Sequence, residues 1–221
     1  VKKENWRVKL NKKININDSW IDIAKKEKLI AHRLGDYSRP NTIQAAINSH
    51  NLGIKFMEVD LILNNKNNIC ILENKGIKNC RINIILDFIA ENDIYLIIDF
   101  KKSIFENSMR NTLNVIETSP NRNEILKRII FQLYEPKDIK TFFKVIKEKN
   151  YYINLPIITL YRSNSTLKKF INQKPKFLNA ITIPIERKNE VISLSRIDNY
   201  LLMTHPIKNC KDFEIANKYS F

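Results

Sequence analysis

The feature that most constrains the fold is a regular alternation of short apolar segments, rich in β-branched residues, with stretches of helical periodicity. Such alternation is typical of a parallel α/β sheet, because each parallel strand needs a crossover segment before the next one. We expect seven major strands, at 28–31, 56–63, 94–98, 128–133, 156–160, 180–185 and 200–204. The segment 94–98 is apolar throughout, as expected for a strand that is buried on both faces.

Helices are expected between these strands. Their ranges are 41–51, 82–91, 106–117, 136–149, 165–172, a short helix around 190, and 210–219. Gly53 follows the first helix as a C-terminal stop, and Pro136 stands at a permitted first-turn position of another. The segment 68–72, which follows a polar turn, predicts a hairpin excursion from the second strand.

No stretch rich in Gly, Pro or Ser divides the 221 residues, and the chain contains only three glycines. We therefore expect a single domain that spans residues 1–221. Seven strands alternating with helices suit either an open doubly wound sheet or a (β/α) barrel without its last strand, because a complete barrel takes about 250 residues. Periodicity alone does not choose between these two architectures.

The net charge of +15 comes from 38 Lys and Arg against 23 Asp and Glu, and it favours an anionic partner. The basic residues are spread along the chain without interleaved aromatic clusters, so we expect no specific nucleic-acid site. A phosphorylated polymer and an anionic membrane surface are the other candidate partners. No apolar run approaches the roughly 18 residues that a membrane-spanning helix needs.

The three cysteines, Cys70, Cys80 and Cys210, show no metal-binding spacing. We interpret them as free thiols in a reducing compartment, or as residues without a role. No signal peptide is visible at the start of the sequence, so we expect a cytoplasmic location. The sequence begins at Val1 rather than Met, which leaves export open as the alternative.

Polar residues interrupt the apolar strands at their carboxyl ends, where parallel α/β folds carry their sites. Glu58 and Asp60 are two residues apart in one strand, so their side chains point to the same face. Asp99 ends the next major strand. Buried carboxylates need a counter-charge, and oxygen ligands suit Mg²⁺ or Ca²⁺. We therefore predict a divalent-metal site on Glu58, Asp60 and Asp99.

Basic and titratable residues accompany these carboxylates. Lys101 follows Asp99 by two residues and would face the same way, so we expect it to hold a phosphate. His32 and Arg33 end the first strand and would add a proton-transfer group and an anion-binding guanidinium. Each residue taken alone is also common at ordinary protein surfaces. Their joint position at successive strand ends favours the functional interpretation.

The order of these motifs resembles the glycerophosphodiester phosphodiesterase family along nearly the whole chain. That family carries, in order, His-Arg-Gly-Gly, Pro-Glu-Asn-Thr, Glu-x-Asp, Glu-x-Lys, phenylalanine–glutamine and a late Thr-Val-Asn strand. The matching segments here are His-Arg-Leu-Gly at 32–35, Pro-Asn-Thr at 40–42, Glu-Val-Asp at 58–60, Asp-Phe-Lys at 99–101, Phe-Gln at 131–132 and Thr-His-Pro-Ile at 204–207.

The resemblance implies a TIM-type barrel that cleaves a small glycerophosphodiester-like or phosphorylated glycan or lipid substrate with the help of a divalent metal. The three carboxylates would ligate the ion. Arg33 and Lys101 would stabilise the charge that builds on phosphorus, and His32 would be one of two acid/base groups.

The chain departs from the family pattern at several positions. Family members carry a second catalytic His fifteen residues after the first metal-binding Glu, and that position here holds Glu73. Either Glu73 or His205 could take its role, or the protein is a catalytically impaired relative that binds a phosphodiester. Leu34 replaces a family Gly. The family's last strand does not follow Phe221, so we expect that the natural gene product continues or that another segment covers the gap.

Overall fold

The computed structural model describes most of the chain. The described residues are 16–36, 38–73, 77–101, 105–160, 169–170, 172–173, 180–187, 200–205, 207 and 209–218. The side chains of 73, 77–78, 187 and 217–218 lie outside this description. The predicted helix at 165–172 lies mostly outside the described residues, and the short helix around 190 lies wholly outside them.

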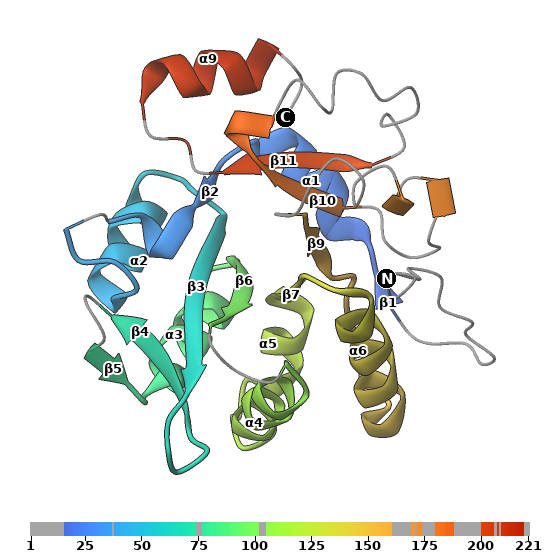
Figure 1. The fold of residues 1–221 in the computed structure, drawn as a ribbon. Coiled ribbons are helices and arrows are strands. Elements are labelled where there is room, and N and C mark those ends of the chain that lie inside the picture. The colour runs from blue at the N-terminus through green and yellow to red at the C-terminus, as the bar shows by residue number, and fades with distance from the viewer. Residues whose placement is uncertain are drawn as a thin grey trace.

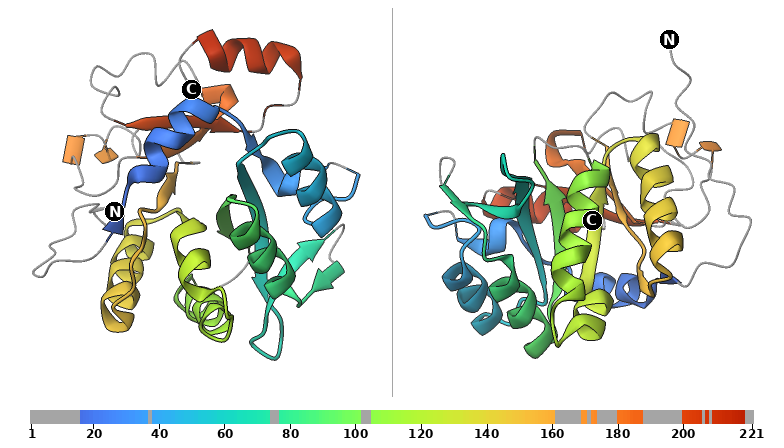
Figure 2. Two further views of the ribbon diagram at one scale, coloured as in Figure 1. Left: turned by 180° about the vertical axis from the view of Figure 1, so that it is seen from behind. Right: turned by 90° about the horizontal axis from the view of Figure 1, so that it is seen from below.

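The centre of the protein is a curled sheet of parallel strands with helices on its outer side (Figure 1; Figure 2). Seven parallel strands follow one another in the order β2 (Ile30–Ala31), β3 (Phe56–Leu63), β6 (Tyr95–Phe100), β7 (Ile129–Leu133), β9 (Ile157–Thr159), β10 (Ala180–Pro184) and β11 (Leu201–His205). They turn through 263°, so they form most of a barrel that is open between β11 and β2. The barrel prediction is confirmed, and the doubly wound alternative is wrong.

Among the described residues, helices and short 3₁₀ turns lie between these strands, with α1 before the first strand and α9 after the last. They are α1 (Ser19–Glu27), η1 (His32–Gly35), α2 (Ile43–Asn51), α3 (Ile82–Glu91), α4 (Phe105–Glu117), α5 (Arg122–Arg128), α6 (Pro136–Lys149), η3 (Ile185–Arg187) and α9 (Cys210–Lys218). α6 begins with Pro136 and a reciprocal capping box between Glu135 and Asp138. No helix among the described residues is long and apolar enough to cross a membrane.

Strand β3 divides its side chains between the two faces of the sheet. Met57, Val59 and Leu61 are fully buried in the apolar cluster between the sheet and the outer helices. The alternate residues Phe56, Glu58 and Asp60 point into the barrel because successive strand side chains face opposite ways. Both ends of β3 match the predicted strand, and β6 pairs with it in parallel.

The amino ends of the barrel strands are closed by α1, which the sequence analysis did not predict. Its Trp20 is completely buried and lies 6.3 Å from the Phe56 ring, measured between ring centroids. Phe56 stacks in turn on Tyr95 at 4.9 Å. The short strand β1 (Ile16–Asn17) pairs with β8 (Ile153–Asn154) beside this helix. The barrel interior near the amino ends of the strands is therefore apolar.

The predicted hairpin excursion is present as β4 (Ile69–Glu73) and β5 (Ile77–Asn79), which continue antiparallel from β3. The prediction of three free thiols is wrong, because Cys70 in β4 forms a disulfide with Cys80 directly after β5. The hairpin brings these cysteines together although they are ten residues apart in sequence. Disulfides are typical of oxidising compartments, so the cysteines do not support a cytoplasmic location.

Reduction of this disulfide is expected to destabilise the protein by about 2–3 kcal/mol, because it frees a short closed loop in the unfolded chain. The melting temperature should fall by about 5–10 °C in a chain of this size. Thermal unfolding followed by circular dichroism, with and without dithiothreitol, measures the shift. The Cys210→Ser variant is the matched control, because Cys210 is an exposed free thiol, and it should show the same shift. An unchanged melting temperature would contradict the disulfide's role.

Candidate active site

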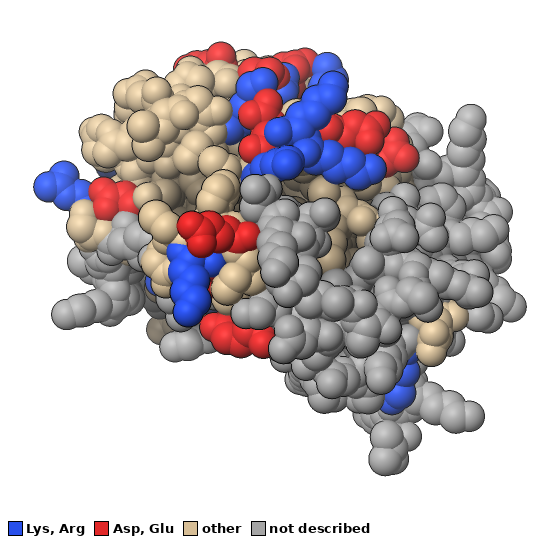
Figure 3. Space-filling view, turned by 90° about the horizontal axis from the view of Figure 1, so that it is seen from above, with Lys and Arg blue, Asp and Glu red and all other residues tan. Residues whose placement is uncertain are grey.

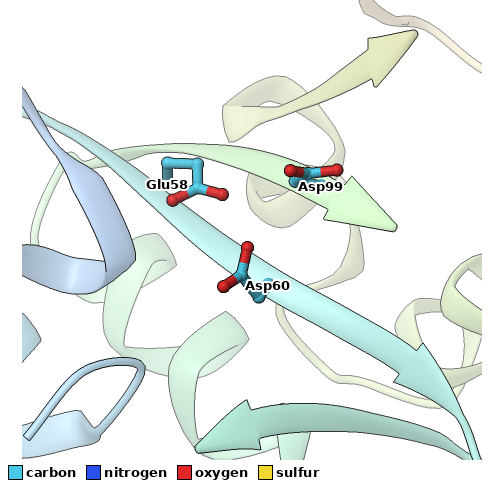
Figure 4. Close-up of side chains that lie close together, drawn as sticks. All are labelled: Glu58, Asp60 and Asp99. Atoms are coloured by element: carbon cyan, nitrogen blue, oxygen red, sulfur yellow. The ribbon is translucent and has the colours of Figure 1, made fainter. Parts of the chain in front are cut away.

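Three buried carboxylates meet inside the barrel at the carboxyl end of the sheet (Figure 4). Glu58 and Asp60 come from β3, and Asp99 comes from the neighbouring β6. The parallel register aligns Asp60 with Asp99, and one oxygen of each of the three lies within 4.8 Å of the others. Their exposed fractions are 6%, 1% and 1%. The predicted convergence of these residues is confirmed.

Among the described residues, Arg33 and Lys101 contact the carboxylate cluster. Arg33 lies in η1, where its backbone N–H donates to Glu58 Oε2 at 2.8 Å and its Nε lies 3.0 Å from Asp60 Oδ2. Lys101 follows β6, with its Nζ 3.0 Å from Asp60 Oδ1 and in contact with Asp99. Both predicted phosphate-binding residues therefore lie beside the predicted metal ligands.

The pKa values within the cluster follow from burial and from these neighbours. Burial raises the pKa of Glu58 well above its usual value, and the charges of Asp60 and Asp99 raise it further. Burial also acts to raise the pKa of Asp60, but Lys101 and Arg33 outweigh it and the pKa is lowered. Burial opposes the charge of Lys101, yet the adjacent Asp99 and Asp60 raise the pKa of its ammonium group.

Asn41 is a contact residue of the cluster that the sequence analysis did not single out. Its Nδ2 donates to Asp60 Oδ2 at 3.3 Å and to the Leu72 carbonyl at 2.7 Å, and its Oδ1 accepts from the Asp60 N–H at 3.1 Å. Asn41 has a φ of 61°, in the left-handed region that Asn tolerates better than most residues. It therefore fixes Asp60 and ties β3 to the end of β4.

The turn that carries His32 and Arg33 is tightly constrained. Arg33 and Leu34 both have positive φ, at 54° and 64°, although neither is Gly. Gly35 follows with a φ of 99° and packs against Ser49 of α2, whose hydroxyl donates to the Leu34 carbonyl at 2.8 Å. Such backbone strain is maintained only where the surroundings enforce it, and it is frequent at functional sites.

Substitution of Gly35 by Ala is expected to lower the free energy of unfolding by about 2–4 kcal/mol. The new Cβ would lie 2.0 Å from Ser49 Oγ, and the backbone φ there is unfavourable for Ala. Adding Ser49→Ala should restore part of the stability, because it removes the clashing atom. Urea unfolding of both variants measures the difference. A Gly35→Ala protein as stable as the wild type would show that the turn has a different conformation.

His32 and His205 line the cavity that Glu58 and Asp99 also line. His32 Nε2 lies 3.8 Å from Glu58 Oε2, and burial together with the Arg33 charge lowers the His32 pKa. His205 ends β11, and its Nδ1 lies 2.7 Å from Thr182 Oγ1. Burial and then the charges of His32 and Lys101 lower the pKa of His205 to about 4. Both predicted histidines thus line the same cavity as Glu58 and Asp99.

Glu73, the third predicted acid/base residue, is described only through its backbone, at the end of β4. Its peptide follows Leu72, whose carbonyl accepts the hydrogen bond from Asn41. A role for the Glu73 side chain stays a prediction. Gln132 of β7, part of the phenylalanine–glutamine segment, lines the same cavity and donates to the Tyr134 hydroxyl at 2.6 Å.

The donor set fits a hard divalent cation. Asp99 Oδ1 is buried and accepts no hydrogen bond from the described residues. Among the described residues, Arg33 and Lys101 are the cations in direct contact with the three carboxylates, and burial together with the charges of Asp60 and Asp99 still raises the pKa of Glu58. A divalent ion with a preference for oxygen ligands would supply the additional positive charge. Within the described residues, these three carboxylates are the group that could hold a metal ion.

The cluster opens into a cavity of about 330 Å³, within the range of small-molecule sites. Glu58, Asp99, Lys101, His32 and His205 all line it. Figure 3 shows the molecule from above, where the described Lys and Arg side chains lie next to Asp and Glu rather than forming one basic patch.

No family model and no curated protein matches this sequence. Solved structures do match it, over 86% of the chain. A phosphodiesterase from Oleispira antarctica, solved with the product sn-glycerol-3-phosphate, has 10% sequence identity and a TM-score of 0.60, with 88% of its chain covered. A glycerophosphodiester phosphodiesterase from Parabacteroides distasonis has 13% identity and a TM-score of 0.62, also with 88% covered.

The chain has the fold of the glycerophosphodiester phosphodiesterases. The resemblance drawn from the order of the sequence motifs is confirmed at the level of this fold. In (β/α) barrels the carboxyl ends of the strands carry the site, and the three carboxylates of this chain lie at that end. At 9–13% identity the sequences have diverged widely.

Proposed function

We propose that this protein is a divergent metal-dependent phosphodiesterase. The observation that carries the proposal is the buried group of Glu58, Asp60 and Asp99 with Arg33 and Lys101 in contact with it. Such a group can bind an ion and an anionic phosphodiester side by side. The substrate is a small phosphodiester, of the glycerophosphodiester type or part of a phosphorylated glycan or lipid.

In this proposal, Glu58, Asp60 and Asp99 hold the divalent ion, Mg²⁺ or Ca²⁺, which supplies Lewis-acid polarisation of a phosphoryl oxygen. Arg33 and Lys101 bind the other phosphate oxygens and stabilise the charge that develops during cleavage.

In this proposal, the two histidines that line the cavity transfer the protons. His32 accepts a proton from the attacking water, and His205, once it has taken up a proton, donates it to the oxygen of the leaving alcohol. Their lowered pKa values leave both imidazoles neutral near pH 7 before substrate binds. The negative charge of a bound phosphodiester favours an imidazolium, so it would allow His205 to take up the proton that it later donates, while His32 stays neutral as the base.

The alternative is a catalytically impaired protein that binds a phosphodiester without turning it over. It is favoured by the Glu at position 73, where the resembling family has its second catalytic His. The two proposals differ in turnover but not in ligand affinity.

Hydrolysis assays decide between them. Glycerophosphocholine and bis-(p-nitrophenyl) phosphate should be cleaved in the presence of Mg²⁺ or Ca²⁺, and EDTA should stop the reaction. A protein that binds glycerophosphocholine but cleaves neither compound with either ion would support the impaired alternative. Cleavage that persists in EDTA would contradict the metal requirement.

A further inference from the structure

Asn41 connects three separate parts of the chain beside the carboxylate cluster. Its backbone N–H donates to the Arg33 carbonyl at 2.8 Å, which joins the two ends of segment 33–41. Its Nδ2 donates to the Leu72 carbonyl at 2.7 Å and to Asp60 Oδ2 at 3.3 Å, and its Oδ1 accepts from the Asp60 N–H at 3.1 Å. Asn41 is only 1% exposed, so water competes little for these contacts. The protein itself therefore holds this amide in place.

The same partners determine which way the Asn41 amide faces. A flipped amide would place its NH2 group against the Asp60 N–H and its oxygen against the Leu72 carbonyl, and both pairs repel. The backbone is equally specific, because φ at Asn41 is 61°, a region that Asn adopts more readily than most residues. Thr42 follows directly as the N-cap of α2. The Asn41 amide thus has one orientation, defined from both sides.

Asp60 is the carboxylate that such an amide can keep in place. One oxygen of each of Glu58, Asp60 and Asp99 lies within 4.8 Å of the others, so their negative charges repel (Figure 4). A carboxylate that rotated freely would turn away from the other two. Asn41 opposes this rotation, because it binds both Oδ2 and the backbone N–H of Asp60. Arg33 Nε lies 3.0 Å from the same Oδ2 and adds to the restraint.

We propose that Asn41 is a positioning residue that sets the affinity of the three carboxylates for a divalent cation. It acts through Asp60, which it keeps turned toward the cluster before an ion binds. A site whose ligands are already ordered loses less conformational freedom on binding, so its affinity is higher. Hydrogen-bonding partners of metal ligands commonly have this effect. The inference rests on the proposed function for the metal site and adds a residue that controls that site.

Substitution of Asn41 by Gly tests the proposal, because Gly adopts a φ of 61° without strain and the change removes the amide. Isothermal titration calorimetry of Ca²⁺, and separately of Mg²⁺, into the metal-free variant should give a Kd about tenfold higher than for wild type. Asn41→Ala removes the same amide but strains the backbone. It should show the same rise in Kd together with a lower urea midpoint than Asn41→Gly. Equal loss of affinity at unequal stability assigns the effect to the amide.

Asn154→Ala is the matched control for a purely structural role. Asn154 is a completely buried asparagine in β8, and its Nδ2 donates to the carbonyls of Lys127 at 2.7 Å and Ile129 at 3.0 Å. Ile129 begins β7, so these contacts lie at the amino ends of the strands, away from the carboxylates. The variant should lower the urea midpoint but leave both cation Kd values within about twofold of wild type.

A measurement on the wild type covers the case in which neither Asn41 variant folds. Both Nδ2 protons of Asn41 are hydrogen-bonded in the metal-free structure, whereas Asn51 at the end of α2 is exposed. Hydrogen exchange followed by NMR in metal-free protein should therefore be slower for the Asn41 side-chain amide than for that of Asn51. Exchange at the rate of Asn51 would show that the amide is not held, and would overturn the proposal.

The outcomes separate this proposal from the proposed function. An unchanged Kd in folded Asn41→Gly, beside a wild type that binds the ion, overturns the role of Asn41 and leaves the metal site intact. An equal rise of Kd in Asn154→Ala does the same, because the effect would then be one of general stability. A wild type that binds neither ion overturns the metal site and the role of Asn41 together. A loss of affinity confined to the Asn41 variants, in a protein without hydrolysis, supports the role of Asn41 and contradicts the phosphodiesterase activity.

Discussion

Replacing Asp60 by Asn should lower kcat/KM for phosphodiester hydrolysis at least about 1000-fold, because a metal ligand with a full charge contributes several kcal/mol to transition-state stabilisation. Asp60 is the central residue of the cluster, since Arg33, Lys101 and Asn41 all contact it. Binding of Mg²⁺ or Ca²⁺ should weaken in parallel. Steady-state kinetics give the first quantity, and the rise in melting temperature on adding metal gives the second.

The matched control for this experiment is Asp22→Asn. Asp22 lies on α1 with an 82% exposed side chain, so the same chemical change there should alter neither activity nor metal stabilisation. Circular dichroism establishes that both variants are folded. If folded Asp60→Asn protein keeps its response to metal ions, the ion is held elsewhere and the assignment of the three carboxylates as ligands fails.

The His205→Gln variant is expected to lose about 100-fold in kcat with KM within about threefold of wild type. Removal of a proton-transfer group acts on the chemical step and leaves ligand binding largely intact. His50→Gln is the control, because His50 lies on α2, where its ring packs edge-on against Phe88 at 5.9 Å. That variant should have wild-type kinetics.

Glu73→Gln separates the two candidates for the missing second acid/base group. If His205 performs the role, Glu73→Gln should change kcat by no more than about threefold. A large loss in Glu73→Gln together with normal turnover in His205→Gln would make Glu73 the acid. Equal kinetics in all three proteins would leave His32 without a partner and contradict the two-histidine scheme.

The main architecture could be predicted because most strands have a local sequence pattern, a short apolar segment rich in β-branched residues. β3 was predicted with both ends correct, and α3 and α6 also match the expected ranges. The two-residue spacing of Glu58 and Asp60 was sufficient to place both on the same face of the strand, since strand geometry fixes that alternation. Asp99 could be added because successive parallel strands end at one edge of the sheet.

The features that could not be predicted depend on contacts between distant segments. The pairing of Cys70 with Cys80 requires the β4–β5 hairpin, and its register is not visible in cysteine spacing. The role of Asn41 depends on a left-handed backbone that places its amide between Asp60 and Leu72. β8 has only two residues, too few for a period-2 pattern to be recognised.

The burial of Trp20 under the barrel makes it an optical probe of the base of the molecule. Its indole is shielded from water, so its fluorescence should shift to longer wavelength when α1 leaves the strands. Trp6 is the second tryptophan of the chain, so a Trp6→Phe background would make Trp20 the single emitter. Comparison of this signal with far-ultraviolet circular dichroism during urea unfolding would show whether the base and the remaining helices unfold in one cooperative transition.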